Sequence, residues 1–297
     1  MKKLRTLITY GLFPATFLIA MFSAAYCIKA GYSGGLIITV ISIVTAIILQ
    51  IGETINPHFK IWNITQNDVW TDAIHAAISM ALIPKIITGL LTAILLVIAL
   101  KLNTFLGYSL WPHNLPLFVQ LILSLLISQF GIYWSHRLMH EIPILWRFHA
   151  THHSPKRLYW LNAARFHPLD TIINSTISLI PLLILGGKGA QEVMVLQTVW
   201  VAVHGMFQHC NIHLRLGFLN YIFSMSELHR WHHSMTLEEA NTNYGSNIIF
   251  WDIVFGTMYY PKNKEASEKI GLSNIEHFPE DYIGQISSPF NWKKLKS

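Results

Sequence analysis

Long apolar runs, separated by short polar or charged stretches, dominate the first half of the chain. The four longest runs cover about residues 8–28, 30–52, 73–100 and 116–134. Each is long enough for the roughly 20 residues that a helix needs to cross the hydrocarbon core of a bilayer. Pro84 and Lys85 interrupt the third run, so we expect an irregular or kinked helix there. The pattern predicts four membrane spans.

Two shorter apolar segments follow, at about 171–187 and 193–209. The sequence Gly186-Gly187-Lys188-Gly189 between them has the composition of a tight helix–helix turn. We therefore expect a helical hairpin that leaves and re-enters on one side of the membrane. Together with the four spans, this hairpin predicts an all-α polytopic membrane bundle.

The composition supports a membrane protein. Charged residues make up 12% of the chain and hydrophobic residues 52%, and the mean hydropathy is +0.40. These values exclude a disordered chain or a coiled coil and argue against a soluble globule. The net charge is +6 with histidine neutral, but the chain has no Lys/Arg-rich run, so we expect no nucleic-acid partner. The two cysteines, Cys27 and Cys210, are too few for a disulfide framework.

The positions of the basic residues predict the orientation. The chain begins Met1-Lys2-Lys3-Leu4-Arg5, and the segment 136–168 carries five Lys/Arg residues against one Glu. By the positive-inside rule, the N-terminus, the segment 136–168 and everything after about residue 204 are cytoplasmic. A basic start before an apolar run is also typical of a signal peptide, but this run is long for one. We expect an uncleaved first span.

The 16 histidines outnumber the 15 Asp and Glu residues, and most of them cluster in the predicted cytoplasmic segments. Four clusters stand out: His136 and His140 as HxxxH; His149, His152 and His153 as HxxHH; His204, His209 and His213; and His229, His232 and His233 as a second HxxHH. Helical spacing of i, i+3 and i+4 lets imidazoles converge, and imidazole suits iron, zinc, copper and nickel. Eight to ten ligands exceed the needs of one ion, so the pattern predicts two.

Other histidines and competing motifs carry less weight. We expect His167 and His213 to pack rather than bind metal, and His58, His75, His113 and His277 to be uninvolved. The HExxH motif of zinc proteases fails, because Ile144 stands where the second histidine belongs. Few carboxylates lie near the clusters in sequence. Asp252 is expected either to accept a hydrogen bond from a ligand imidazole or to cap a turn. We expect no catalytic residue beyond the metal ligands.

Further segments accompany the histidine clusters: Arg165-Phe166-His167-Pro168, the run from Phe207 to Ile212, Asn243-Tyr244-Gly245, Trp251-Asp252 and Phe255-Gly256-Thr257. On these residues the chain from about 115 to 260 resembles the sterol desaturase / fatty acid hydroxylase superfamily of integral membrane di-iron enzymes. The resemblance implies an oxidoreductase that uses O2 to hydroxylate or desaturate a C–H bond of a fatty acyl, alkyl or sterol-like lipid. It also implies electrons from a separate donor protein, such as a cytochrome b5, a ferredoxin or a reductase.

The resemblance further implies two iron ions, with zinc conceivable in the purified protein. The implied ligands are His136, His140, His149, His152, His153, His204, His209, His229, His232 and His233. It divides the chain into N-terminal spans (1–114), a catalytic region (115–260) and a polar C-terminal tail (261–297). An alternative stays open, namely a histidine-rich membrane metalloprotein of another class, either a zinc-dependent hydrolase or a non-catalytic metal-binding protein.

Overall fold

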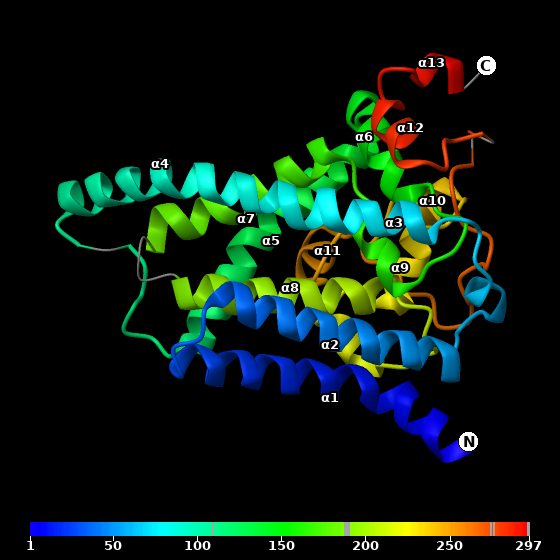
Figure 1. Ribbon diagram of the computed structural model, residues 1–297, viewed down its shortest axis with the longest axis horizontal. Coiled ribbons are helices and arrows are strands. Elements are labelled where there is room, and N and C mark those ends of the chain that lie inside the picture. The colour runs from blue at the N-terminus through cyan, green and yellow to red at the C-terminus, as the bar shows by residue number, and fades with distance from the viewer. Residues whose placement is uncertain (109, 187–190, 274, 276, 296–297) are drawn as a thin grey trace.

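A computed structural model describes residues 1–108, 110–186, 191–273, 275 and 277–295 (Figure 1). In that part of the chain the regular elements are helices, and the only β pairings are isolated bridges such as Pro57 with Ile212. The prediction of an all-α helical bundle is confirmed.

Four helical segments of the described chain are long and apolar enough to cross a membrane. They are α1 (Lys2–Lys29), α2 (Gly34–Ile55), the continuous run Val69–Leu106 and α5 (Leu117–Glu141). The prediction of four spans is confirmed, and the chain is a multi-pass membrane protein. The last helix runs past the predicted end at Trp134 to Glu141, so it carries the HxxxH pair beyond the apolar stretch.

The third span is irregular just before Pro84 and Lys85, where the sequence predicts a kink or an irregular helix. It consists of α3 (Val69–His75), the π-helical segment η2 (Ala76–Leu82) and α4 (Ile83–Leu106). Pro84 lies in the first turn of α4, where its missing N–H and bulky ring disturb the regular hydrogen bonds to the preceding turn. A π-helical segment just before it accommodates the disturbance without ending the helix.

The two shorter apolar segments form α7 (Pro168–Gly186) and α8 (Gln191–His209). Residues 187–190 of the predicted Gly-rich turn lie outside the described residues. Helix α7 packs against α4 and α5, whereas α8 packs against α1, α2 and α5. Phe13 and Phe17 of α1 contact Phe207 and Trp200 of α8, so the first span is part of the bundle core.

The histidine clusters gather at one end of the bundle, the end at which both chain termini are found (Figure 1). The two HxxHH motifs lie at the short helices α6 (Pro143–His153) and α9 (Ser226–His232), whereas the HxxxH pair and His209 lie in the last turns of α5 and α8. The short elements η3 (Trp160–Ala164), α10 (Leu237–Ala240) and α11 (Phe250–Phe255) lie between and after these helices along the chain. The 3-10 turns η1 (Lys60–Asn63) and η5 (Gly217–Tyr221) complete the loops.

The C-terminal residues fold back over this end rather than extending away from it. They contain α12 (Tyr282–Ser287) and α13 (Trp292–Leu295), drawn in red in Figure 1. Trp292 packs with Ala150 of α6, and the buried Gln285 accepts a hydrogen bond from His75 of the third span at 2.8 Å. The polar tail therefore covers the outer side of the histidine-bearing helices.

Candidate metal centre

The structure gathers nine of the ten predicted ligands into two adjacent groups. The five-histidine group contains His136, His140, His149, His153 and His232. The four-histidine group contains His152, His209, His229 and His233. Within each group, one nitrogen from every residue lies within 4.8 Å of the others. Two compact sets of imidazoles are the arrangement that a pair of metal ions would need.

Helical geometry explains how each HxxHH motif serves both groups. On α6, His149 and His153 are four residues apart and join the five-histidine group, while His152 turns to the other. At α9 the division is reversed, because His229 and His233 join the four-histidine group and His232 the five-histidine group. Residues at i and i+4 share a helix face, and the residue at i+3 lies about 100° round from i+4. The two motifs therefore hold the groups side by side.

Six of the imidazoles have their Nδ1 atom fixed by an oxygen acceptor. The contacts are His136 to the Tyr244 carbonyl at 2.6 Å, His149 to Asp170 Oδ2 at 2.7 Å, His232 to the Thr242 carbonyl at 2.7 Å, His209 to Asn162 Oδ1 at 3.1 Å, His140 to Asn241 Oδ1 at 3.2 Å and His152 to the Arg165 carbonyl at 3.2 Å. These oxygens accept only, so Nδ1 must carry the proton. In the neutral ring, Nε2 is then a free lone pair, which is the form that binds metal.

The free nitrogens fit a bound cation. His136 Nε2 and His232 Nε2 lie 3.0 Å apart although both rings hold their proton on Nδ1, so two lone pairs face each other. The Nε2 atoms of His140, His149 and His153 are buried without a hydrogen-bond partner. A cation shared by these nitrogens satisfies all of them at once, whereas no arrangement of protons on the six fixed rings does so.

Burial keeps these candidate ligands neutral. The pKa values of His152, His153, His229, His232 and His233 are lowered well below the usual histidine range, first by burial and then by the neighbouring imidazoles, and for His232 a hydrogen bond to the Thr242 carbonyl acts in the opposite direction. No carboxylate belongs to either group. A neutral all-nitrogen donor set suits iron, zinc, copper or nickel rather than magnesium or calcium.

Asp252 caps a turn, which is the second of the two roles that the sequence predicts for it. Its carboxylate accepts hydrogen bonds from the backbone N–H groups of Tyr244 and Gly245, at 2.8 and 2.7 Å, and from the Thr257 hydroxyl at 2.8 Å. Burial raises the pKa of Asp252 to about 6, against the lowering effect of these hydrogen bonds. The residue caps the turn whose Tyr244 carbonyl holds His136, and so acts on this candidate ligand through the backbone.

Position 245 in that turn has room only for glycine. A Cβ atom there would lie 2.5 Å from the Ile248 carbonyl oxygen and 2.7 Å from Asp252 Oδ2, both too close for a side chain. The residue of this turn with left-handed backbone is Asn243, with φ of 53°, rather than the glycine. Asn243 tolerates this conformation because its side chain bonds to the backbone of Leu228 and Tyr259.

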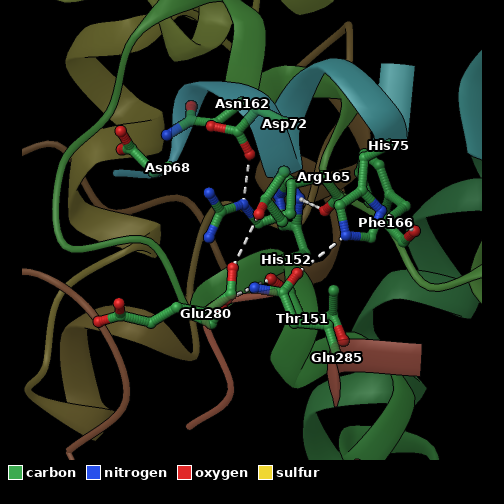
Figure 2. A network of polar contacts seen from close by, with 12 residues as sticks. Asp68, Asp72, His75, Thr151, His152, Asn162, Arg165, Phe166, Glu280 and Gln285 are labelled. Atoms are coloured by element: carbon green, nitrogen blue, oxygen red, sulfur yellow. Dashed lines mark hydrogen bonds and ion pairs between the residues drawn. The ribbon is translucent and has the colours of Figure 1, made fainter. Parts of the chain in front are cut away.

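A buried polar network supports the four-histidine group from the third span (Figure 2). Asp72 Oδ1 accepts a hydrogen bond from Arg165 Nε at 2.5 Å, and both side chains are almost fully buried. The Arg165 carbonyl is the acceptor for His152, and the next carbonyl, that of Phe166, contacts Nδ1 of His75 at 3.0 Å. An ion pair between a span and a loop thus fixes the backbone that holds a candidate ligand.

His204 is the predicted ligand that the structure leaves apart from both groups. Its ring is buried between Phe13 of α1 and Phe223, and neither ring nitrogen has a hydrogen-bond partner. His213 and His58 stack on each other, with their Nδ1 atoms 3.2 Å apart. His167 bonds to the Ile286 carbonyl at 3.1 Å. Neither His213 nor His167 belongs to the two groups.

The sequence did not identify the residues that orient the imidazoles. Asp170, Asn162 and Asn241 hold His149, His209 and His140, yet they lie up to 101 residues from their partners. Asp170 was recognisable as a carboxylate in the first turn of an otherwise apolar helix, directly after the Arg165–Pro168 segment. For Asn162 and Asn241 no sequence signal pointed to an imidazole.

Comparison with known proteins gives one family and a set of lipid-modifying relatives. The profile of the family described as fatty acid hydroxylase matches residues 121–257. The chain is 35% identical to the ornithine lipid hydroxylase OlsE of Rhizobium tropici over 259 residues, which is 86% of this chain and 76% of that protein. It is 33% identical to human alkylglycerol monooxygenase over 132 residues, 43% of this chain and 28% of that protein.

A plant sterol enzyme is also similar. The Delta(7)-sterol-C5(6)-desaturase of Nicotiana tabacum is 29% identical over 150 residues, which covers 48% of this chain and 51% of the desaturase. The chain therefore spans about half of the desaturase and less than a third of the human monooxygenase. No solved structure matches the chain. The matches to these two enzymes and to the family profile cover less than half of the chain each.

Proposed function

This chain belongs to the fatty acid hydroxylase family, within the sterol desaturase / fatty acid hydroxylase superfamily, and we propose that it is an O2-dependent di-iron hydroxylase of a membrane lipid. Its relatives are lipid hydroxylases, monooxygenases and desaturases, so the chain is a lipid-oxidising enzyme. The observation that carries the more specific proposal is the pair of neighbouring imidazole groups with their Nδ1 protons turned away from the centre.

The two groups would each hold one iron ion. His136, His140, His149, His153 and His232 would bind the first, and His152, His209, His229 and His233 the second. Bound iron in a nitrogen site with open positions supplies O2 activation and the oxidising power for an unactivated C–H bond. His204 is left out of the proposed ligand set because aromatic rings, and none of the other predicted ligands, surround it.

The chain's own residues prepare this site in two ways. Asp170 and the carbonyl oxygens of Tyr244, Thr242 and Arg165 fix the tautomer and orientation of four ligand rings. Burial excludes water, which keeps the imidazoles neutral and limits loss of oxidising equivalents to solvent. A site of this kind can be loaded with metal without first releasing protons from its ligands.

The substrate would reach the site from the bilayer. Below the five-histidine group, α5 continues as a membrane span, and the short helix α11 beside it exposes Phe250, Ile253 and Val254. Such apolar surfaces favour acyl or alkyl chains over soluble compounds. The chain covers 76% of the ornithine lipid hydroxylase, whose substrate is an amino-acid-containing lipid. It covers only 51% of the sterol desaturase. This favours hydroxylation, with an aminolipid as the first substrate to test.

We place the active site on the cytoplasmic face. The histidine-bearing helices lie at the same end of the bundle as the basic N-terminus (Figure 1). The positive-inside rule assigns that end to the cytoplasm. This position would also give a separate cytoplasmic electron donor access to the metal centre, because hydroxylation by O2 needs two electrons that the lipid does not provide.

The zinc hydrolase alternative gains little from the serines that follow the two HxxHH motifs. The Ser154 hydroxyl donates to the Thr151 carbonyl at 2.8 Å and the Ser234 hydroxyl to Glu239 at 2.6 Å, so neither donates to an imidazole that could act as its base. A GxSxG sequence does occur, at residues 31–35, but it forms the turn between α1 and α2 at the far end of the bundle (Figure 1). There Ser33 caps α2, with its hydroxyl accepting from the backbone N–H of Leu36 at 3.4 Å. A hydrolase would therefore have to rely on metal-bound water alone.

An isotope experiment separates the two functions. Iron-loaded protein would be incubated with a chemical or enzymatic reductant, 18O2 and a lipid extract enriched in aminolipids, and the products analysed by mass spectrometry. The hydroxylase predicts a lipid 16 Da heavier in 16O2 and 18 Da heavier in 18O2. A product two hydrogens lighter would indicate the desaturase instead. Oxygen taken from water, or product formed without O2, would refute the oxygenase and favour the hydrolase.

A further inference from the structure

A cavity of about 320 Å³ lies behind α9, on the side away from the two histidine groups. Its lining includes four cationic side chains, Arg215, Arg230, Lys262 and Lys264, and two carboxylates, Glu227 and Glu265. The cationic residues come from three separate parts of the chain, so the fold rather than a local sequence run brings them together. Neither the sequence motifs nor the family likeness accounts for this cavity.

Arg230 is the unexplained residue in the cavity wall. Its side chain is 2% exposed, yet its one hydrogen bond runs from Nη1 to the Cys210 carbonyl at 3.5 Å, the limit of such a contact. No carboxylate lies within ion-pair distance of it in the described part of the chain. A buried guanidinium normally has an anionic or multiply hydrogen-bonded partner, because removing it from water is costly.

The other charged groups have partners of their own. Glu227 accepts hydrogen bonds from the backbone N–H of Leu216, from Asn220 and from Tyr260, and it also pairs with Arg215 at 3.8 Å. Glu265 pairs with Arg215 at 2.7 Å, and Lys264 pairs with Glu239 outside the cavity lining. Lys262 is exposed at the rim, and the structure gives it no ion pair. The cavity therefore keeps an excess of positive charge.

The surroundings of His58 agree with this excess. The pKa of His58, which also lines the cavity, is lowered to about 2, first by burial and then by Arg230, His213 and Arg215. An anion in the cavity would offset the effect of the two arginines.

We propose that this cavity is an anion-binding site in which Arg230 and Lys262 hold a phosphate group. A phosphate offers several acceptor oxygens and up to two charges, so it can use the buried guanidinium and the rim lysine together. The cavity is much larger than the anion, so the group can belong to a larger molecule. A lipid headgroup of the adjacent leaflet and a soluble phosphate share this chemistry.

The test is binding, measured on the metal-loaded full chain in nanodiscs. One arm titrates inorganic phosphate into nanodiscs of phosphatidylcholine by calorimetry. The other measures retention of short-chain phosphatidic acid against phosphatidylcholine. Arg230→Gln and Lys262→Glu should each weaken binding roughly tenfold or more, the loss expected for one charge-assisted contact. The matched control Lys269→Glu makes the same charge change on an exposed lysine outside the cavity lining and should bind like the unaltered chain.

The outcomes are distinct. Binding of inorganic phosphate that both cavity variants weaken supports a soluble phosphate ligand, and selective loss of phosphatidic acid supports a lipid headgroup. Lys262→Glu lies away from the metal ligands and keeps the test valid if Arg230→Gln does not fold. No binding of either probe, or equal weakening by Lys269→Glu, would overturn the proposal and leave Arg230 solvated by water. None of these outcomes depends on the proposed hydroxylase activity.

Discussion

Nδ1 of His149 lies 2.7 Å from Oδ2 of Asp170, and both side chains are almost completely shielded from solvent. Asp170 Oδ1 in turn accepts a hydrogen bond from Asn174 at 2.6 Å, which fixes the carboxylate one helical turn along α7. A carboxylate in the first turn of α7 is therefore the group that sets the tautomer of a proposed ligand in the five-histidine group. Partners of this kind raise ligand basicity and restrict ring rotation.

Asp170→Asn should weaken the five-histidine group without unfolding the protein. The amide keeps the size of the carboxylate and one acceptor oxygen, but it lacks the charge that favours the protonated Nδ1. We expect a loss of roughly 10- to 100-fold in metal affinity or turnover, as for other residues that orient metal ligands. Metal content by mass spectrometry and lipid turnover would measure it. Glu192→Asn, at an exposed position in the first turn of α8, is the control. Unchanged affinity and turnover in Asp170→Asn would show that the pair is only structural.

Single histidine substitutions should empty one group at a time. We expect His232→Ala to lose the ion of the five-histidine group and His152→Ala that of the four-histidine group, so each variant should retain about half of the metal. Both should lose activity. The measurement is metal per protein after purification in iron. Full metal content in both variants would refute the assignment. Zinc in the purified protein would not decide the native metal, since zinc binds such nitrogen sites at least as tightly as Fe(II).

His204→Leu provides the matched comparison. Both ring nitrogens of His204 are buried without a partner, so an apolar side chain of similar volume removes a desolvation cost of roughly 1–3 kcal/mol. We expect unchanged metal content and equal or higher thermal stability. Loss of metal in this variant would return His204 to the ligand set.

The contrast between His204 and its neighbour His209 shows where the sequence was informative and where it was not. The length of the apolar runs was enough to predict the four spans, because a helix needs a minimum length to cross a bilayer. The i, i+4 spacing was enough to place His136 and His140 on one face of α5. On α8, however, both histidines belong to one helix, and only tertiary packing decides that His209 meets His229 while His204 meets Phe13.

Long-range partners escaped prediction for the same reason. The His140–Asn241 and His136–Tyr244 contacts join segments more than 100 residues apart. No periodicity links such positions, because their approach depends on how α5 meets the loop after α10. Asp252 illustrates a partial success, since its proximity to the site was expected but the choice between imidazole and turn depended on the backbone path of residues 243–245.

The metal-free protein should lose stability in acid. Burial lowers the folded-state pKa of His152, His153, His229, His232 and His233 far below the unfolded value of 6.5. Below pH 6.5 the unfolded chain therefore binds more protons than the folded one, and the free energy of unfolding falls with pH. The loss is about 1.4 kcal/mol per histidine for each pH unit below 6.5, as an upper bound for coupled groups.

Thermal unfolding of chelator-treated protein at pH 7.5 and 5.5 would measure this effect. The melting temperature should drop between the two values, and His152→Ala should reduce the drop because one titrating group is removed. Restoring metal should raise the melting temperature at both pH values, because the buried imidazoles of the folded protein are neutral and able to bind metal at each. A melting temperature independent of pH in the metal-free protein would contradict the buried, neutral state of these imidazoles.

Reporter fusions test the orientation. A reporter fused after Ser297 should score as cytoplasmic, and one inserted after Gly31, in the turn between α1 and α2, should score as external. The reason is the excess of Lys/Arg in the segment 136–168, which is at the same end as the N-terminus. The opposite pattern would place the metal centre outside and exclude a cytoplasmic electron donor.

The ion pair between Asp72 and Arg165 should matter more than any exposed pair of the same kind. Asp72→Ala leaves the Arg165 guanidinium buried without its carboxylate, and one of its nitrogens, Nη2, already lacks a partner. Breaking a buried pair in this way costs about 3–5 kcal/mol of unfolding free energy. Because the Arg165 carbonyl holds His152, we also expect weaker metal binding in the four-histidine group than in the five-histidine group.

Glu280→Ala is the matched control for that prediction. It breaks the pair with Lys156, in which both side chains are more than half exposed, and exposed pairs contribute about 0–1 kcal/mol. Chemical unfolding in detergent and the spectroscopic signature of cobalt loaded into the two groups would measure stability and ligand geometry separately. A variant that is destabilised but keeps the unaltered cobalt spectrum would show that Asp72 supports the fold without positioning His152. An altered spectrum in Asp72→Ala, absent from Glu280→Ala, would identify Asp72 as a positioning residue of the metal centre.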